Sequence, residues 1–135
     1  MPTLLIIDDN ESVRESLKHV FSRYGYTVVV AESGEAGLGL YAKGGIDAAL
    51  VDINMPGMNG VETCRLLHTE ARGSGREIFV WLMTGAIGSL IEGRALEAGA
   101  LAVLHKPFNM AEFVRDLDQR VKSRTRSSIE CEPTS

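Results

Sequence analysis

The sequence has few cysteines and no long apolar run, and each absence excludes a class of protein. Only two cysteines occur in 135 residues, Cys64 within a helical pattern and Cys131 near the end. Neither has the spacing of a metal site or of a disulfide framework. This usage suits a reducing cytosol, so we expect a cytoplasmic protein. The first apolar run, from Leu4 to Ile7, is too short for a signal peptide or a membrane span.

The body of the chain also lacks a cluster of basic residues. Its formal net charge is −4, whereas a nucleic-acid surface needs clustered lysine and arginine side chains to displace counterions. We therefore expect no direct nucleic-acid binding and no membrane association. A hydrophobic content of 44% is sufficient to close one core without disulfides, and the length predicts one domain.

Five short apolar runs alternate with helical patterns. The runs lack polar alternation, which predicts strands buried on both faces, and they are Leu4 to Ile7, Thr27 to Val30, Ala48 to Val51, Ile78 to Met83 and Ala102 to Leu104. Helices are expected after Asn10, from about Gly34 to Lys43, from Asn59 to about Ala71, from roughly Gly88 to Ala98, and from Asn109 onward. This alternation predicts a parallel sheet that is covered by helices on both faces.

Apolar stripes predict which helical side chains point inward. The first helix has such a stripe at Val13, Leu17, Val20, Phe21 and Tyr24, and the last has one at Phe113, Val114, Leu117 and Val121. Residues after about Ser123 are almost entirely polar. We therefore expect a domain over residues 1–122 and a disordered tail or linker stub over residues 123–135.

Polar residues follow four of the five predicted strands. Asp8 and Asp9 follow the first, Asp52 the third, Thr84 the fourth and Lys106 the fifth. Because ligands of open parallel sheets bind beyond the carboxyl ends of the strands, these residues form a candidate site. With strand order 2-1-3-4-5, the first and third strands are neighbours, and the three carboxylates are close together.

Three crowded carboxylates repel one another unless a cation lies between them. Oxygen donors without Cys or His favour Mg²⁺ or Mn²⁺, which leave positions open for phosphate oxygens. Lys106 offers an ammonium group and Thr84 a hydroxyl donor to a phosphoryl group. Asp52 lies at the centre of this arrangement, and a carboxylate can attack phosphorus to give an aspartyl phosphate.

The same residues belong to four motifs. These are Leu5-Ile6-Ile7-Asp8-Asp9-Asn10, Val51-Asp52-Ile53-Asn54-Met55-Pro56-Gly57-Met58-Asn59-Gly60, Met83-Thr84-Gly85 and His105-Lys106-Pro107-Phe108. Together they resemble the receiver domain of two-component response regulators, over Thr3 to about Lys122. The resemblance implies a flavodoxin-like (βα)5 fold and a phosphorylation-dependent signalling switch.

The resemblance also implies residue roles. Asp52 would accept phosphate from a sensor histidine kinase or a His-phosphotransfer protein. Mg²⁺ would be bound by Asp9, Asp52 and the backbone carbonyl of Asn54, with Asp8 acting through water. A cis bond between Lys106 and Pro107 would direct the ammonium group into the pocket. The only catalysis implied is the chain's own phosphorylation and slow dephosphorylation.

Further partners would be a downstream protein target or a missing output domain, and a dimer that forms on phosphorylation is a further candidate.

Val103 departs from the family pattern, because an aromatic residue that moves with the threonine usually stands three positions before the lysine. This favours one alternative, a degenerate receiver that acts only as a docking module. A second alternative is a phosphatase of the haloacid dehalogenase class, but its second acid, two residues after the nucleophile, is replaced by Asn54.

Overall fold

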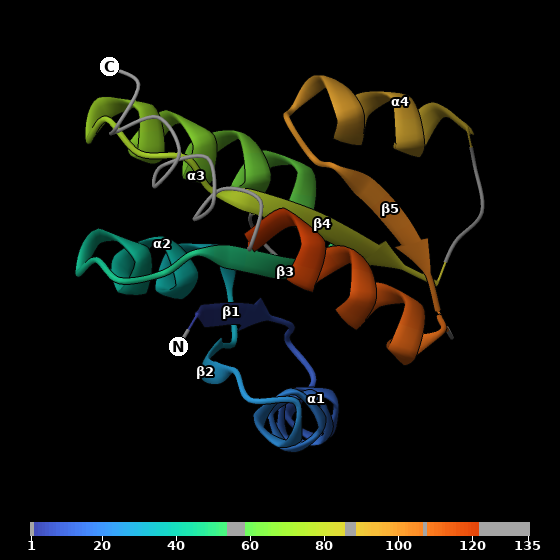
Figure 1. Cartoon of the computed structure of the whole chain (residues 1–135). Helices are drawn as coiled ribbons and strands as arrows, with labels where there is room; N and C mark the ends of the chain where they lie inside the picture. Colours follow the sequence, from blue (N-terminus) through green and yellow to red (C-terminus); the bar gives the residue numbers. More distant parts are fainter. Residues whose placement is uncertain (1, 54–58, 86–88, 107, 122–135) are drawn as a thin grey trace, which may run out of the picture.

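The computed structural model describes residues 2–53, 59–85, 89–106 and 108–121. Its five strands are β1 (Thr3–Ile7), β2 (Thr27–Ala31), β3 (Ala48–Asp52), β4 (Phe79–Thr84) and β5 (Ala102–His105). They form one parallel sheet in the order β2-β1-β3-β4-β5. Helices cover both faces of this sheet (Figure 1). The predicted fold class is therefore confirmed.

The helices alternate with the strands along the chain. They are α1 (Glu11–Arg23), α2 (Gly34–Ala42), α3 (Gly60–Gly73) and α4 (Ser89–Glu97). A further helix over residues 110–121, drawn in red and without a label in Figure 1, follows β5 and is here called the last helix. No helix in the described ranges has the length and apolar character that a membrane span needs.

Side-chain caps start four of the helices where the sequence predicts them. Asn10, Ser33, Asn59 and Asn109 each accept a hydrogen bond from a backbone N–H three residues ahead, at distances of 2.9 to 3.1 Å. Each cap satisfies one of the N–H groups that lack a partner in the first helical turn. The starts of these helices are thus determined locally, by single polar residues.

Two hydrophobic clusters lie on opposite sides of the sheet. Alternate strand residues separate them, since Leu5 and Ile7 of β1 belong to one cluster and Leu4 and Ile6 to the other. The first cluster includes residues of α2, α3 and α4, and the second includes residues of α1 and the last helix. β1, β3 and β4 are thus buried on both faces, as their apolar runs predict. The same prediction is wrong for β2 and β5, which are largely half-buried because they lie at the edges of the sheet.

The inward stripe of the last helix is confirmed, but that of α1 is wrong at one position. Phe113, Val114, Leu117 and Val121 are all buried. Tyr24, predicted to continue the α1 stripe, is instead 50% exposed. Its backbone (φ −84°, ψ 1°) has already left the helix as the C-cap, so the helical spacing no longer places its side chain on the buried face.

Several boundaries also differ from the prediction by one or two residues: β1 begins one residue earlier, and the other four strands each end one residue later. α3 continues to Gly73, which the sequence places in a loop, because the N–H groups of Ser74 and Gly75 still donate to carbonyls of the last helical turn. β4 begins at Phe79 rather than Ile78. The last described residue is number 121. The predicted domain boundary after residue 122 and the predicted tail therefore lie outside the described residues.

Candidate functional site

The strand register places the predicted site residues at one edge of the sheet. Ile7 of β1 pairs with Val51 of β3, so Asp8 and Asp52 both stand one residue beyond this pair. On the other side, Asp52 pairs with Met83, and Thr84 pairs with His105. Asp52 and Thr84 are therefore the last residues of β3 and β4, rather than the first residues beyond them as predicted. Asp8 and Lys106 directly follow β1 and β5, and Asp9 lies one residue further.

Three carboxylates from two strands meet at this edge. Oxygen atoms of Asp8, Asp9 and Asp52 lie within 4.8 Å of one another. Asp8 is only 1% exposed and Asp52 only 5%, whereas Asp9 is exposed. Two negative charges are thus held away from water, and the third faces it.

Lys106 brings a positive charge to the same cluster. Its Nζ atom lies 3.4 Å from Oδ2 of Asp8 and 3.7 Å from Oδ2 of Asp52. The lysine side chain is 34% exposed, so it lies between the buried carboxylates and the solvent. One cation beside three carboxylates offsets part of their repulsion and leaves the cluster negative, which favours a dication.

Backbone hydrogen bonds fix the strand ends that carry these side chains. The N–H of Asp8 donates to the carbonyl of Ala31 at 3.1 Å, and the N–H of Lys106 donates to that of Thr84 at 2.8 Å. Beyond Asp52, the N–H of Ile53 donates to the carbonyl of Met83 at 2.9 Å. Thr84 itself is fully buried. The ladder therefore continues past the last regular pairs and holds the site on the rigid sheet.

Gly60, the first residue of α3, packs directly against the backbone that carries Asp52. A Cβ atom at this position would overlap the carbonyl oxygen of Asp52 and lie 2.7 Å from the Cα of Ile53. The N–H of Gly60 also donates to the carbonyl of Ile53 at 3.1 Å. Sequence reasoning gave this glycine no role, although a glycine that directly follows a helix cap is a signal of close backbone approach.

Two predictions lie outside the described residues. The first is the metal ligand Asn54, which belongs to the undescribed range 54–58. The second is the cis bond between Lys106 and Pro107, because residue 107 is also outside the described ranges. The described part of the site offers only carboxylate oxygens as anionic donors. These are the ligands that hard dications prefer, so the residues present fit Mg²⁺ or Mn²⁺.

The family model of the response regulator receiver domain matches residues 4–118 of this chain. The response regulator MprA of Mycolicibacterium vanbaalenii is 36% identical over 111 residues. That of Mycobacterium tuberculosis strain H37Rv is 35% identical over the same length. Both alignments cover 82% of this chain but only 46% of the relative. The chain therefore spans less than half the length of these relatives.

Solved structures agree with the observed topology. The chemotaxis protein CheY4 of Vibrio cholerae has a TM-score of 0.79 and 28% identity, covering 90% of this chain and 98% of the other. A CheY-like receiver domain protein of Methanospirillum hungatei JF-1 has a TM-score of 0.84 and 25% identity, covering 94% and 98%. The similarity thus extends over almost the whole length of each solved chain.

Proposed function

The chain belongs to the response regulator receiver family, and on this premise we propose that Asp52 accepts a phosphoryl group in a phosphorylation-dependent signalling switch. The observation that carries the proposal is the meeting of Asp8, Asp9 and Asp52 within 4.8 Å, with the Lys106 ammonium group beside them. A charge cluster of this kind destabilises a fold unless it binds a ligand. A dication together with a phosphoryl group is the ligand that matches its charges.

We assign Asp8, Asp9 and Asp52 to a Mg²⁺ or Mn²⁺ site, with the backbone carbonyl of Asn54 as a further proposed ligand. When bound, the ion neutralises the carboxylates and binds phosphoryl oxygens. Asp9, which is exposed, would receive the ion from solvent, and Asp52 would hold it from the buried side, with the buried Asp8 acting through water.

In the proposed transfer, a carboxylate oxygen of Asp52 attacks the phosphorus atom of a phosphohistidine. A bond between oxygen and phosphorus forms, the bond between phosphorus and the imidazole nitrogen breaks, and the electron pair stays on the nitrogen. Lys106 stabilises charge on one phosphoryl oxygen, and the Thr84 hydroxyl donates to another. The chain catalyses only its own phosphorylation and slow dephosphorylation, and its donor is a sensor histidine kinase or a His-phosphotransfer protein in the cytoplasm.

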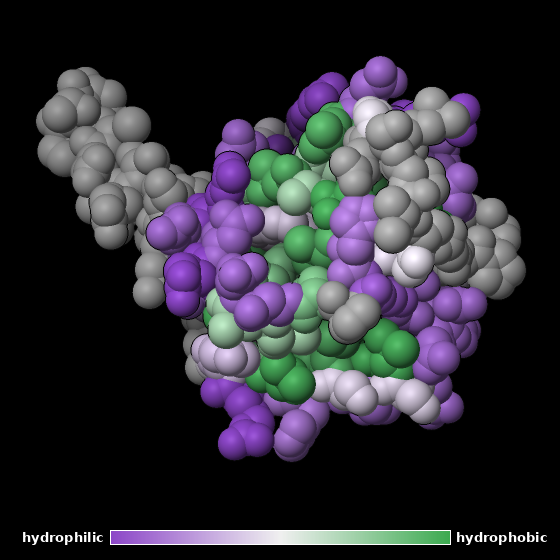
Figure 2. All heavy atoms as spheres, turned by 90° about the vertical axis from the view of Figure 1, so that its right-hand side faces the viewer, coloured by the Kyte–Doolittle hydropathy of each residue, from purple (hydrophilic) through white to green (hydrophobic). Residues whose placement is uncertain are grey.

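The output surface is proposed on the side of the molecule formed by α4, β5 and the last helix. β5 is an edge strand whose four residues are all half-buried, and Leu96 of α4 is 55% exposed. Figure 2 shows apolar residues between hydrophilic ones on the right-hand side of Figure 1. A downstream protein, an output domain or a second copy of the chain would dock there.

Intact-mass spectrometry with acetyl phosphate and Mg²⁺ tests this proposal. The wild type should gain one phosphoryl group, and Asp52→Asn, which keeps the size of the side chain, should gain none. Glu35→Gln, at an exposed position of α2, controls for the loss of one carboxylate and should behave as the wild type. Uptake that persists in Asp52→Asn would assign the phosphoryl group to another residue.

The same experiment separates the two alternatives. A docking module, favoured by Val103 in place of an aromatic residue, gains no mass. Val103 is half-buried and packs against the hydrophobic cluster that includes residues of α2, α3 and α4. Valine, which is smaller than the usual aromatic residue, therefore still contributes to the core at this position. A phosphatase would release phosphate over many turnovers without accumulating a phosphorylated form.

A further inference from the structure

Arg14, in the first part of α1, reaches back to the loop that carries two of the site carboxylates. Its Nη1 atom donates a hydrogen bond to the backbone carbonyl of Asp8 at 2.8 Å. Its backbone N–H donates to the carbonyl of Asn10 at 3.0 Å. The side chain and the main chain of Arg14 thus each donate one hydrogen bond to the segment from Asp8 to Asn10.

The helix itself gives no reason for a cation at this position. Arg14 is the fourth residue of α1, where the N–H groups of the first turn give the helix end a partial positive charge. A basic side chain is unfavourable there, and carboxylates are preferred. Arg14 is also half-buried, so it has lost part of its hydration. The contact with Asp8 accounts for a placement that helix stability opposes.

This hydrogen bond controls the direction of the next residue. The carbonyl of Asp8 and the N–H of Asp9 belong to one planar peptide unit, so fixing the carbonyl also fixes the orientation of that N–H. The Asp8 side chain is already held twice, by the N–H of Asn10 at 2.9 Å and by Lys106 at 3.4 Å. Asp9 is exposed, and water does not impose a single geometry on it.

We infer that Arg14 is a positioning residue for the metal site, which orients the peptide between Asp8 and Asp9 and thereby directs the Asp9 carboxylate toward Asp8 and Asp52. Arg14 touches no reacting group and acts through the backbone. The part of this inference that concerns metal affinity rests on the proposed function. The part that concerns the orientation of the peptide does not.

Two measurements on the full chain test the inference. Calorimetric titration with Mg²⁺ should show about 10-fold weaker binding in Arg14→Ala than in the wild type, as is common when a residue that orients a ligand is removed. In the metal-free protein, NMR relaxation should show a lower order parameter for the Asp9 amide in Arg14→Ala. Arg14→Lys, which can donate one hydrogen bond to the carbonyl, should recover part of both losses.

Arg23→Ala is the matched control, because Arg23 lies in the last turn of the same helix and is exposed. It should leave both measurements unchanged, and urea denaturation should show that every variant folds. Wild-type affinity in Arg14→Ala would overturn the inference, as would weaker binding with an unchanged Asp9 order parameter, since the loss of affinity would then not come from the orientation of the peptide. Absence of Mg²⁺ binding in the wild type would instead count against the proposed function.

Discussion

The two faces of the sheet are packed in different ways. One face, covered by α1 and the last helix, is here called the aromatic face, and the other, covered by α2, α3 and α4, the small-residue face (Figure 1). Large rings fill the first, whereas glycine, alanine and cysteine let helices approach closely on the second. The candidate site lies at the edge between them, so the contrast shows which face stabilises the fold and which one shapes the site.

The aromatic face is built around Phe113 of the last helix. Its ring contacts those of Phe21, Trp81 and Phe108 edge-on, with centroid distances of 5.2 to 5.9 Å. Carboxylates of the same helix anchor it to the sheet, because the Trp81 indole donates to Asp116 at 3.1 Å and the Tyr26 hydroxyl donates to Asp118. Burial and this carboxylate raise the pKa of Tyr26 well above its ordinary value.

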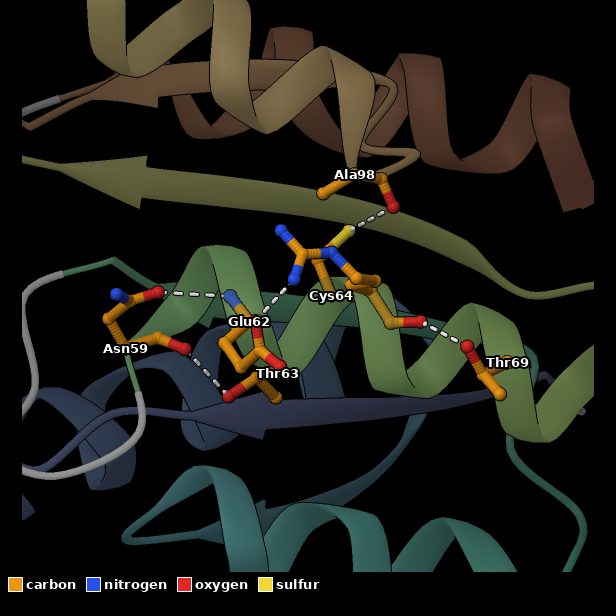
Figure 3. Close-up of polar contacts among 7 residues, drawn as sticks. Asn59, Glu62, Thr63, Cys64, Thr69 and Ala98 are labelled. Atoms are coloured by element: carbon orange, nitrogen blue, oxygen red, sulfur yellow. Dashed lines mark hydrogen bonds and ion pairs between the residues drawn. The ribbon is translucent and has the colours of Figure 1, made fainter.

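The small-residue face brings α3 close to both the sheet and α4. Six alanines and Cys64 belong to its cluster, so less side-chain volume separates the layers than on the aromatic face. Figure 3 shows the Cys64 thiol donating to the carbonyl of Ala98, at 3.6 Å. Burial raises the pKa of this thiol to about 12, so it acts as a packed side chain rather than a nucleophile. On this face the backbone of α3 packs directly, at Gly60, against the backbone that carries Asp52.

The largest expected effect is a loss of stability on the aromatic face. Phe113→Ala should lower the free energy of unfolding by about 4 kcal/mol, because a buried ring and three ring contacts are removed. Urea denaturation measures this loss. Phe113→Leu keeps most of the apolar volume and guards against complete unfolding. In variants that remain folded, Mg²⁺ affinity should stay near that of the wild type, since the rings that Phe113 contacts belong to Phe21, Trp81 and Phe108, none of which is a predicted site residue.

Tyr24→Ala is the control for this change, because Tyr24 is a large aromatic residue that is 50% exposed. It should alter the free energy of unfolding by less than about 0.5 kcal/mol. If Phe113→Ala cost no more than Tyr24→Ala, the aromatic face would not be the main source of stability, and the comparison between the faces would fail.

The second effect is smaller in stability but larger at the site. Gly60→Ala should cost about 2 kcal/mol, because its Cβ meets the backbone of Asp52 and Ile53, which cannot turn aside as a side chain can. The end of β3 must shift, so Mg²⁺ affinity and phosphoryl uptake should both fall. Urea denaturation, calorimetry and intact-mass spectrometry measure the three quantities.

Gly73→Ala is a matched control at the other end of the same helix, since a Cβ there meets nothing within 4 Å. Alanine has the higher helix propensity, so this variant should gain about 0.5 kcal/mol and bind Mg²⁺ as the wild type does. Equal stabilisation by both substitutions would show that α3 can move away from β3 without cost, contrary to the proposed coupling.

Much of this architecture could be predicted because its determinants are local. Apolar runs mark buried strands, and single asparagine and serine residues mark helix starts. Once the strand order is assumed, the carboxyl ends of the strands predict which edge of the sheet carries the site. Asp8, Asp52 and Lys106 lie together for this reason.

The contacts that could not be predicted depend on how elements pack in three dimensions. The overlap that a side chain at Gly60 would cause depends on the distance between α3 and β3. The hydrogen bond of Arg14 depends on the path of a long side chain. The prediction that Tyr24 is buried was wrong for a local reason. The backbone leaves the helix at Tyr24, one residue earlier than the apolar pattern indicates.

His68 offers a finer test of the small-residue face. It lies one turn after Cys64 on α3, and its imidazole packs against Gly99, where a Cβ would lie 2.7 Å from Nε2. The backbone of Gly99 has a φ of 106°, a conformation that L side chains rarely adopt. Burial lowers the pKa of His68, and Arg72 on the same helix lowers it further, although a backbone hydrogen bond at Gly99 acts in the opposite direction.

The expected result is a pH-dependent loss of stability that originates at this contact. The folded state favours neutral His68, whereas the unfolded chain takes up the proton near the ordinary histidine pKa of about 6.5. The stabilisation is therefore complete above this value and is lost as the pH falls below it, toward the lowered pKa of the folded state. Urea denaturation between neutral and mildly acidic pH should show that the stability of His68→Gln depends less on pH than that of the wild type.

His19→Gln, at an exposed position of α1, controls for the loss of one imidazole. Equal pH dependence in the wild type and His68→Gln would mean that the small-residue face accommodates a charged imidazole, and the close packing argued for this face would then not extend to the end of α4.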